Sequence, residues 1–161
     1  MTFQKLDPKT LREHKGVSYV GVTTTALCHD GKGHFLMMKR GKGARDEHGM
    51  WDIVGGGLKA GEPILENLKR EIDEELCVEV EEVVSLGYRD VHRKLYDGTK
   101  THWVALDHLV RVDPKLVKVG EPEVIDEIGW FTLEKLPFPL HSQFPAFLAQ
   151  YQEVINKVLL K

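Results

Sequence analysis

The chain has 161 residues, a formal net charge of −3 and a pI of about 6.2, so it has no basic excess that would favour binding to a nucleic-acid backbone. Hydrophobic residues make up 42% of the chain, yet no apolar run approaches the roughly 20 residues that span a bilayer. The two cysteines do not make a disulfide framework, and the first residues lack an apolar signal segment. We therefore expect one domain over residues 1–161, located in the cytoplasm.

Strands alternate with two main helices in the predicted order of elements. In the first half we expect an extended arm or short edge element at 1–15, strands at 17–28 and 34–40 joined by a hairpin turn, a polar loop at 41–50 and a short strand at 51–54. After a glycine-rich loop we expect a helix that begins at Pro63, strands at 78–88 (extending to 94), 99–112 and 126–131, a turn of helix at 132–136 and an amphipathic helix at 147–159. This order predicts an α/β fold with a mixed sheet between helices.

The stretch from residue 55 to residue 78 has the clearest chemical pattern. Its three glycines let the backbone approach an anionic ligand closely. The helix that follows is predicted to bury an apolar stripe of Leu65, Leu68, Ile72 and Leu76.

Three glutamates, Glu71, Glu74 and Glu75, share another face of this helix. Like charges at this spacing destabilise a helix by roughly 0.2–0.5 kcal/mol per pair. Arg70 offsets part of the repulsion, and a divalent cation would offset more. A glutamate-rich face by itself is usually only solvated surface. Clustered carboxylates nevertheless suit hard cations, and magnesium keeps coordination positions for water and for substrate phosphates.

The ordered set of residues in this stretch resembles the Nudix box of the Nudix hydrolases. That motif reads Gly, five residues, Glu, seven residues, Arg-Glu, an aliphatic residue, any residue, Glu-Glu, any residue, Gly and an aliphatic residue. The matching positions are Gly56, Glu62, Arg70, Glu71, Ile72, Glu74, Glu75 and Val78. Cys77 stands where the family has Gly, at a helix end where Gly usually supplies a left-handed cap. Val54 replaces a proline that often precedes the glycines. We refer to residues 56–78 as the box.

The resemblance implies an α/β/α sandwich and an enzyme that hydrolyses the pyrophosphate of a nucleoside diphosphate linked to another group. Nucleoside triphosphates, nucleotide sugars and ADP-ribose all belong to that class. The implied cofactor is Mg²⁺ or Mn²⁺. Its implied ligands are Glu71, Glu74, Glu75 and the carbonyl of Gly55. Arg70 would orient the cluster, and Glu62 would hold the loop or reach the metal through water.

The resemblance leaves two places open for the base that activates water. One is Glu71 or Glu74 within the box. The other is the loop before the last strand, which contains Glu121, Glu123, Asp126 and Glu127, and from which we select Glu123. The partner is expected to be a small nucleotide, with no nucleic-acid polymer or membrane, and a homodimer is compatible with the family. For substrate binding we select Arg40, Gly56, Glu62 and Trp51.

Two other functions stay open at this point. An isomerase of isoprenoid diphosphates has the same fold but uses an active-site cysteine, and Cys28 and Cys77 both look structural. A catalytically silent nucleotide-binding module is the second alternative. Such modules usually lose box carboxylates, all of which are present here.

Overall fold

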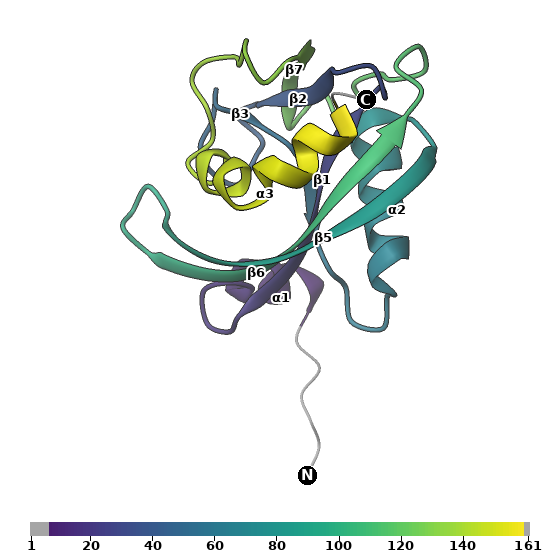
Figure 1. The fold of residues 1–161 in the computed structure, drawn as a ribbon. Coiled ribbons are helices and arrows are strands. Elements are labelled where there is room, and N and C mark those ends of the chain that lie inside the picture. The colour runs from purple at the N-terminus through teal and green to yellow at the C-terminus, as the bar shows by residue number, and fades with distance from the viewer. Residues whose placement is uncertain (1–6, 160–161) are drawn as a thin grey trace.

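The structure, a computed structural model, describes residues 7–159 of the chain. These residues form a seven-stranded sheet with three helices (Figure 1). The elements are α1 (Pro8–His14), β1 (Gly21–His29), β2 (Phe35–Arg40), β3 (Trp51–Asp52), β4 (Val54–Gly57), α2 (Ile64–Leu76), β5 (Val80–Lys94), β6 (Lys100–Val112), β7 (Ile125–Phe131) and α3 (Phe144–Leu159). Among the described residues, none of the helices combines the length and apolar character needed to cross a membrane.

The sheet is mixed, as predicted. Its strands follow the order β3-β2-β1-β6-β5, while β4 pairs with β1 and β7 pairs with β2. Strands β1 and β6 are parallel, and the other pairings are antiparallel. Because β4 pairs with the central strand β1, helix α2 begins beside the middle of the sheet.

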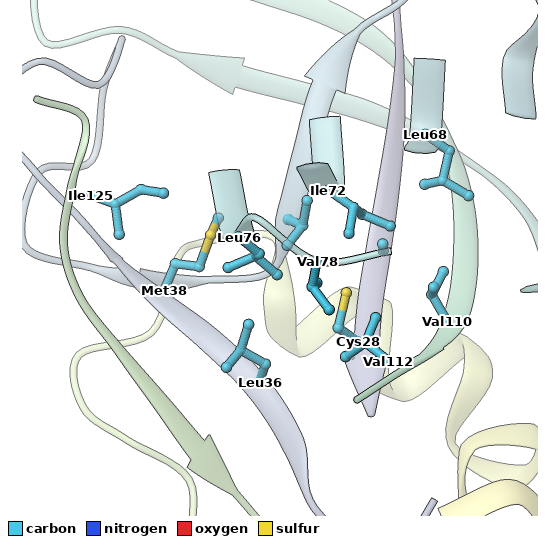
Figure 2. Close-up of a cluster of buried hydrophobic side chains, with 12 residues drawn as sticks. Cys28, Leu36, Met38, Leu68, Ile72, Leu76, Val78, Val110, Val112 and Ile125 are labelled. Carbon is cyan, nitrogen blue, oxygen red and sulfur yellow. The ribbon is translucent and has the colours of Figure 1, made fainter. Parts of the chain in front are cut away.

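Two hydrophobic clusters cover opposite faces of the sheet. Alternate residues of β1 and β2 belong to different clusters, as the pleat of a strand requires. One cluster contains Ala26, Cys28, Leu36 and Met38 with Leu68, Ile72 and Leu76 of α2 (Figure 2). The other contains Leu27, Phe35 and Met37 with Phe144, Phe147, Tyr151 and Ile155 of α3. A helix on each face of the sheet confirms the predicted α/β/α sandwich.

The apolar stripe of α2 differs from the prediction at its first turn. Leu65 is 49% exposed, whereas Asn67 is fully buried. The Asn67 side chain accepts a hydrogen bond from Thr24 Oγ1 (2.6 Å) and donates to the Gly57 carbonyl (3.1 Å). A buried amide with satisfied partners costs little, so Asn67 replaces Leu65 in the interface and ties α2 to β1 and β4.

Three other predictions were wrong. Residues 8–14 form helix α1 rather than an extended arm, because Asp7 caps it by accepting from the Thr10 N–H (3.0 Å) and Pro8 occupies its first turn. Residues 1–6 of the expected arm lie outside the described residues. The glycine-rich loop is instead strand β4, paired with β1. Residues 132–136 form a turn closed by a bridge between Thr132 and Lys135, not helix.

Cys77 adopts the left-handed conformation that the family glycine would supply, with φ 53° and ψ 35°. Its N–H donates to the Asp73 carbonyl (2.9 Å), so the helix cap is retained. A residue with a Cβ pays roughly 1–2 kcal/mol for this conformation, and glycine does not.

We therefore expect Cys77→Gly to raise the free energy of unfolding by about 1 kcal/mol, which in a chain of this size raises Tm by about 2–4 °C. Thermal denaturation followed by circular dichroism measures the shift. Cys77→Ala is the matched control, since it keeps the strained φ and should bring no gain. An equal gain in both variants would mean that the backbone conformation is not the cause.

Candidate active site

Arg70 lies at the centre of the box carboxylates. Its Nε donates to Glu62 Oε1 (2.7 Å), and its Nη1 lies 2.9 Å from both Glu71 Oε1 and Glu74 Oε2. Arg70 and Asn67 together lower the pKa of Glu62 to about 2. Glu62 is thus a fixed negative charge that holds Arg70, and Arg70 in turn draws Glu71 and Glu74 to one point.

For two carboxylates of the box, Glu71 and Glu75, burial and neighbouring negative charges disfavour the ionised form. Burial raises the pKa of Glu71 despite the opposing effect of Arg70, and Glu74 and Glu121 raise it further. Burial also raises the pKa of Glu75 well above its ordinary value, and Glu71 and Glu121 add to the effect. Glu75 Oε2 is buried without a hydrogen-bond partner. An orphaned carboxylate oxygen among other carboxylates fits a cation ligand.

Gly56 makes room for the Glu71 carboxylate. A Cβ atom at residue 56 would overlap all three atoms of that group. The close approach explains why the box has glycine here, where β4 passes the carboxylates of α2. The neighbouring Gly55 lies opposite Thr25 in the β1–β4 ladder, and its backbone hydrogen bond to Glu75 partly offsets the raised pKa of that group.

The oxygens of Glu71, Glu74 and Glu75 do not all lie within 4.8 Å of one another in the described structure. Glu74 is exposed, and its Oε2 lies 2.9 Å from Arg70 Nη1.

The loop before β7 brings Glu121 toward the box, whereas Glu123 is exposed. Glu121 contributes to the raised pKa of Glu71 and of Glu75, and its own pKa is raised by burial, Glu74 and Glu123. The loop is attached to the end of α2: the Gly120 N–H donates to the Glu75 carbonyl (2.9 Å) and the Lys118 N–H to the Leu76 carbonyl (2.9 Å). These contacts fix the start of the loop at the end of α2, and the charge of Glu121 acts on Glu71 and Glu75.

The two substrate-binding candidates outside the box have internal partners. Trp51 is 7% exposed, and its ring packs edge-on against Phe131 at 5.1 Å. Arg40 pairs with Asp46 (2.9 Å) and Asp52 (3.3 Å) and so holds the loop at 41–50. The structure gives Trp51 a core position and leaves the Arg40 guanidinium half-buried within ion pairs.

Lys15, which the sequence patterns did not single out, lies beside the box. It follows α1, and its Nζ donates to the carbonyl of Leu58, directly after β4. Burial lowers the pKa of its ammonium, and the nearby carboxylates of Glu71 and Glu62 oppose that change. Its backbone is fixed because Arg45 donates to the Lys15 carbonyl (3.1 Å) and because Gly16 packs tightly on Trp103.

Comparisons with known proteins agree with this architecture. The family model described as NUDIX domain matches residues 20–151. An oxidized purine nucleoside triphosphate hydrolase from Danio rerio is 30% identical over 119 residues, which cover 73% of this chain and 69% of the relative. An uncharacterized Nudix hydrolase from Yersinia pestis is 29% identical over 116 residues, and the match covers 70% of this chain but only 59% of that protein.

Solved structures show the same fold. A MutT Nudix hydrolase from Burkholderia pseudomallei superposes with a TM-score of 0.71 at 32% identity, covering 82% of this chain and 98% of that one. The Nudix domain of Shewanella oneidensis NrtR, solved with ADP ribose, superposes with a TM-score of 0.66 at 17% identity over 93% and 94% of the two chains, and so supports the fold alone. The chain belongs to the Nudix hydrolase family, as the box predicted. Segment α1 and Lys15 lie outside the matched residues.

Proposed function

We propose that this protein hydrolyses the pyrophosphate of a nucleoside diphosphate linked to another group, with Mg²⁺ or Mn²⁺ as cofactor. The observation that carries the proposal is the unpartnered, buried Oε2 of Glu75 beside Glu71, whose own pKa is raised. Glu71, Glu74, Glu75 and the Gly55 carbonyl would hold the metal. These are oxygen donors, which Mg²⁺ and Mn²⁺ prefer.

The hydrolysis needs a bound metal, residues that hold the metal ligands in place and a base that activates water. The metal, when bound, supplies positive charge to the pyrophosphate oxygens and acidifies a bound water. Arg70 and Glu62 hold the carboxylate cluster in register. The base takes a proton from the attacking water and is therefore ionised when it acts. A raised pKa makes a carboxylate a stronger proton acceptor, and this suits Glu71, or Glu121 outside the box, to that role. We place Glu121 ahead of Glu123 as the outside base, because its charge acts on the box.

Nucleoside triphosphates are the first substrates to test, because the Danio rerio relative is named for oxidized purine nucleoside triphosphates. Nucleotide sugars and ADP-ribose complete the panel. Purified protein is incubated with each compound and Mg²⁺ or Mn²⁺, and the products are identified by chromatography. We expect a nucleoside monophosphate product that requires the metal. No hydrolysis of any compound with either metal would overturn the proposal.

The two alternatives fit less well. Cys28 is fully buried in the cluster under α2, and burial raises the pKa of its thiol, so it is no acid or base for an isomerase. Cys77 lies at the end of α2, where it serves as the helix cap. A silent binding module is disfavoured because the box keeps every carboxylate and their surroundings leave Glu75 uncompensated.

Lys15 is expected to bind a substrate phosphate. Its ammonium has three protons and makes one hydrogen bond among the described residues, to Leu58, so that protons remain for an anion beside the carboxylates. We expect Lys15→Met to raise KM about tenfold or more with little change in kcat, since a charge-assisted hydrogen bond contributes about 1.5–3 kcal/mol. Steady-state kinetics measures both constants.

Lys9→Met is the control for Lys15, because Lys9 is exposed on α1, the helix that Lys15 follows. Lys15→Arg, which keeps the charge, should recover part of the affinity. If Lys15→Met instead lowers Tm and kcat together and leaves KM unchanged, Lys15 acts only in holding α1 against β4.

A further inference from the structure

We propose that Asp90, His92 and His102 form a binding site for a transition-metal dication of the zinc type, separate from the box. All three side chains lie on the β5–β6 hairpin, which Figure 1 shows reaching away from α2. The inference does not depend on the proposed hydrolase activity.

The register of the hairpin brings the three side chains together. His92 lies directly opposite His102 in the antiparallel pair, and Asp90 is two residues before His92 and thus on the same face. The two imidazole rings stack with centroids 4.2 Å apart. His102 Nε2 lies 2.6 Å and His92 Nε2 3.4 Å from the same atom, Asp90 Oδ1. Two histidines from different strands therefore aim their ring nitrogens at one carboxylate oxygen.

These separations are close to those of a metal site. Ligands about 2.0–2.1 Å from a tetrahedral zinc ion are about 3.3–3.4 Å apart. The His92–Asp90 distance of 3.4 Å already has that value, and the three ligand atoms all lie within 4.8 Å of one another. To reach this separation, His102 Nε2 has to move away from Asp90 Oδ1 by about 0.7–0.8 Å. The metal ion then takes the place of the proton that the two atoms share in their hydrogen bond. The side chains are 40–66% exposed, so small rotations meet little resistance.

A second cluster has ligand atoms at similar separations, but its carboxylates are already paired with an arginine and are not available to a metal. Asp46, Glu47 and His141 meet the same separation of ligand atoms, but Arg93 contacts both carboxylates, at 3.0 and 2.6 Å. Asp90, in contrast, makes its ion pairs with the two histidines alone among the described residues. Its charge is therefore available to a metal without displacing an arginine.

Solvent also reaches the site. His92 lines an open hollow of about 410 Å³ together with residues of both strands near Lys94 and Lys100. The three side chains are each at least 40% exposed, which leaves room for a water to complete the coordination shell. Imidazole ligands favour zinc, nickel or copper over magnesium, so the ion differs from the one expected at the box.

The test uses full-length protein without an affinity tag, with excess Mg²⁺ present to occupy the box carboxylates. Zn²⁺ is titrated by calorimetry, and Ni²⁺ is followed by paramagnetic broadening of backbone amide resonances. We expect one Zn²⁺ per chain, broadening confined to residues around 90–92 and 100–102, and binding weakened about tenfold or more in His92→Gln and in His102→Gln. Both substitutions change exposed side chains, and Asp90→Asn provides a third variant.

His34→Gln is the matched control, because His34 also pairs with an aspartate, Asp30 (2.9 Å), but without a second histidine. Its Zn²⁺ affinity should equal that of the unaltered protein. Equal affinity in the His92 and His102 variants would overturn the proposal. Half an ion per chain accompanied by dimers would also overturn it, since a site shared between two copies is not the one described.

Discussion

Glu71→Gln should lower kcat/KM for nucleotide hydrolysis on the order of 10³-fold, which is about 4 kcal/mol of transition-state stabilisation. The amide keeps the size of the side chain but removes the charge beside Gly56 and Glu75. Loss of a metal ligand should appear independently of activity, because Mg²⁺ should raise the Tm of the unaltered protein more than that of the variant. Initial rates and thermal denaturation with and without Mg²⁺ measure the two effects.

The control for this experiment lies on the same helix. Glu66 is exposed, and among the described residues its ion pair is with Lys69, at 3.5 Å. Glu66→Gln therefore removes one negative charge from α2 without changing a residue of the cluster. Its kcat/KM and its response to Mg²⁺ should match those of the unaltered protein. If Glu71→Gln retained full activity, the box carboxylates would not be the metal ligands and the proposed reaction would lose its basis.

Gly56→Ala should cost about 10²-fold in kcat/KM although it adds only one methyl group. The new Cβ would overlap the Glu71 carboxylate, which must then leave its place, and a displacement of about 1 Å at a catalytic group costs about 10²-fold. Kinetics with saturating Mg²⁺ measures the loss. Because the substitution displaces the Glu71 carboxylate and does not disrupt the fold, the far-UV circular dichroism spectrum should remain unchanged.

Gly57→Ala is the matched control for Gly56→Ala. A Cβ at residue 57 would lie 3.0 Å from Lys15 Nζ, the end of a flexible side chain that can move aside. We expect a much smaller loss, expressed in KM rather than kcat. Equal losses in kcat for both variants would show that any added methyl group on β4 impairs activity, and that displacement of the Glu71 carboxylate is not the specific cause.

The sandwich and the box could be predicted from the sequence because both are recognised from patterns of residues that are close together along the chain. The β-branched run of β1, the apolar run of β2 and the spacing of Glu71, Glu74 and Glu75 involve only neighbours along the chain. Helix α1 had a local signal as well, since aspartate followed by proline is typical of a helix start.

The remaining features depend on contacts between distant residues. Periodicity placed Leu65 inside, but the partner that lets Asn67 take its place is Thr24, on another strand. Lys15 lies beside the box, and its backbone is held there by Arg45 and by the packing of Gly16 on Trp103 of β6. Glu121 and Glu123 are equivalent in sequence, and the attachment of Gly120 to α2 distinguishes them.

That attachment has a consequence for how the protein can vary. The backbone of residues 118–120 continues the hydrogen bonding of α2 past its last turn, and a Cβ on Gly120 would overlap the Glu74 carbonyl. The start of the loop that contains Glu121 is therefore held to the end of α2 by backbone hydrogen bonds. Insertions or deletions between residues 118 and 121 would shift an acidic group relative to the glutamates, so the length of this short stretch should tolerate far less change than an ordinary surface connection.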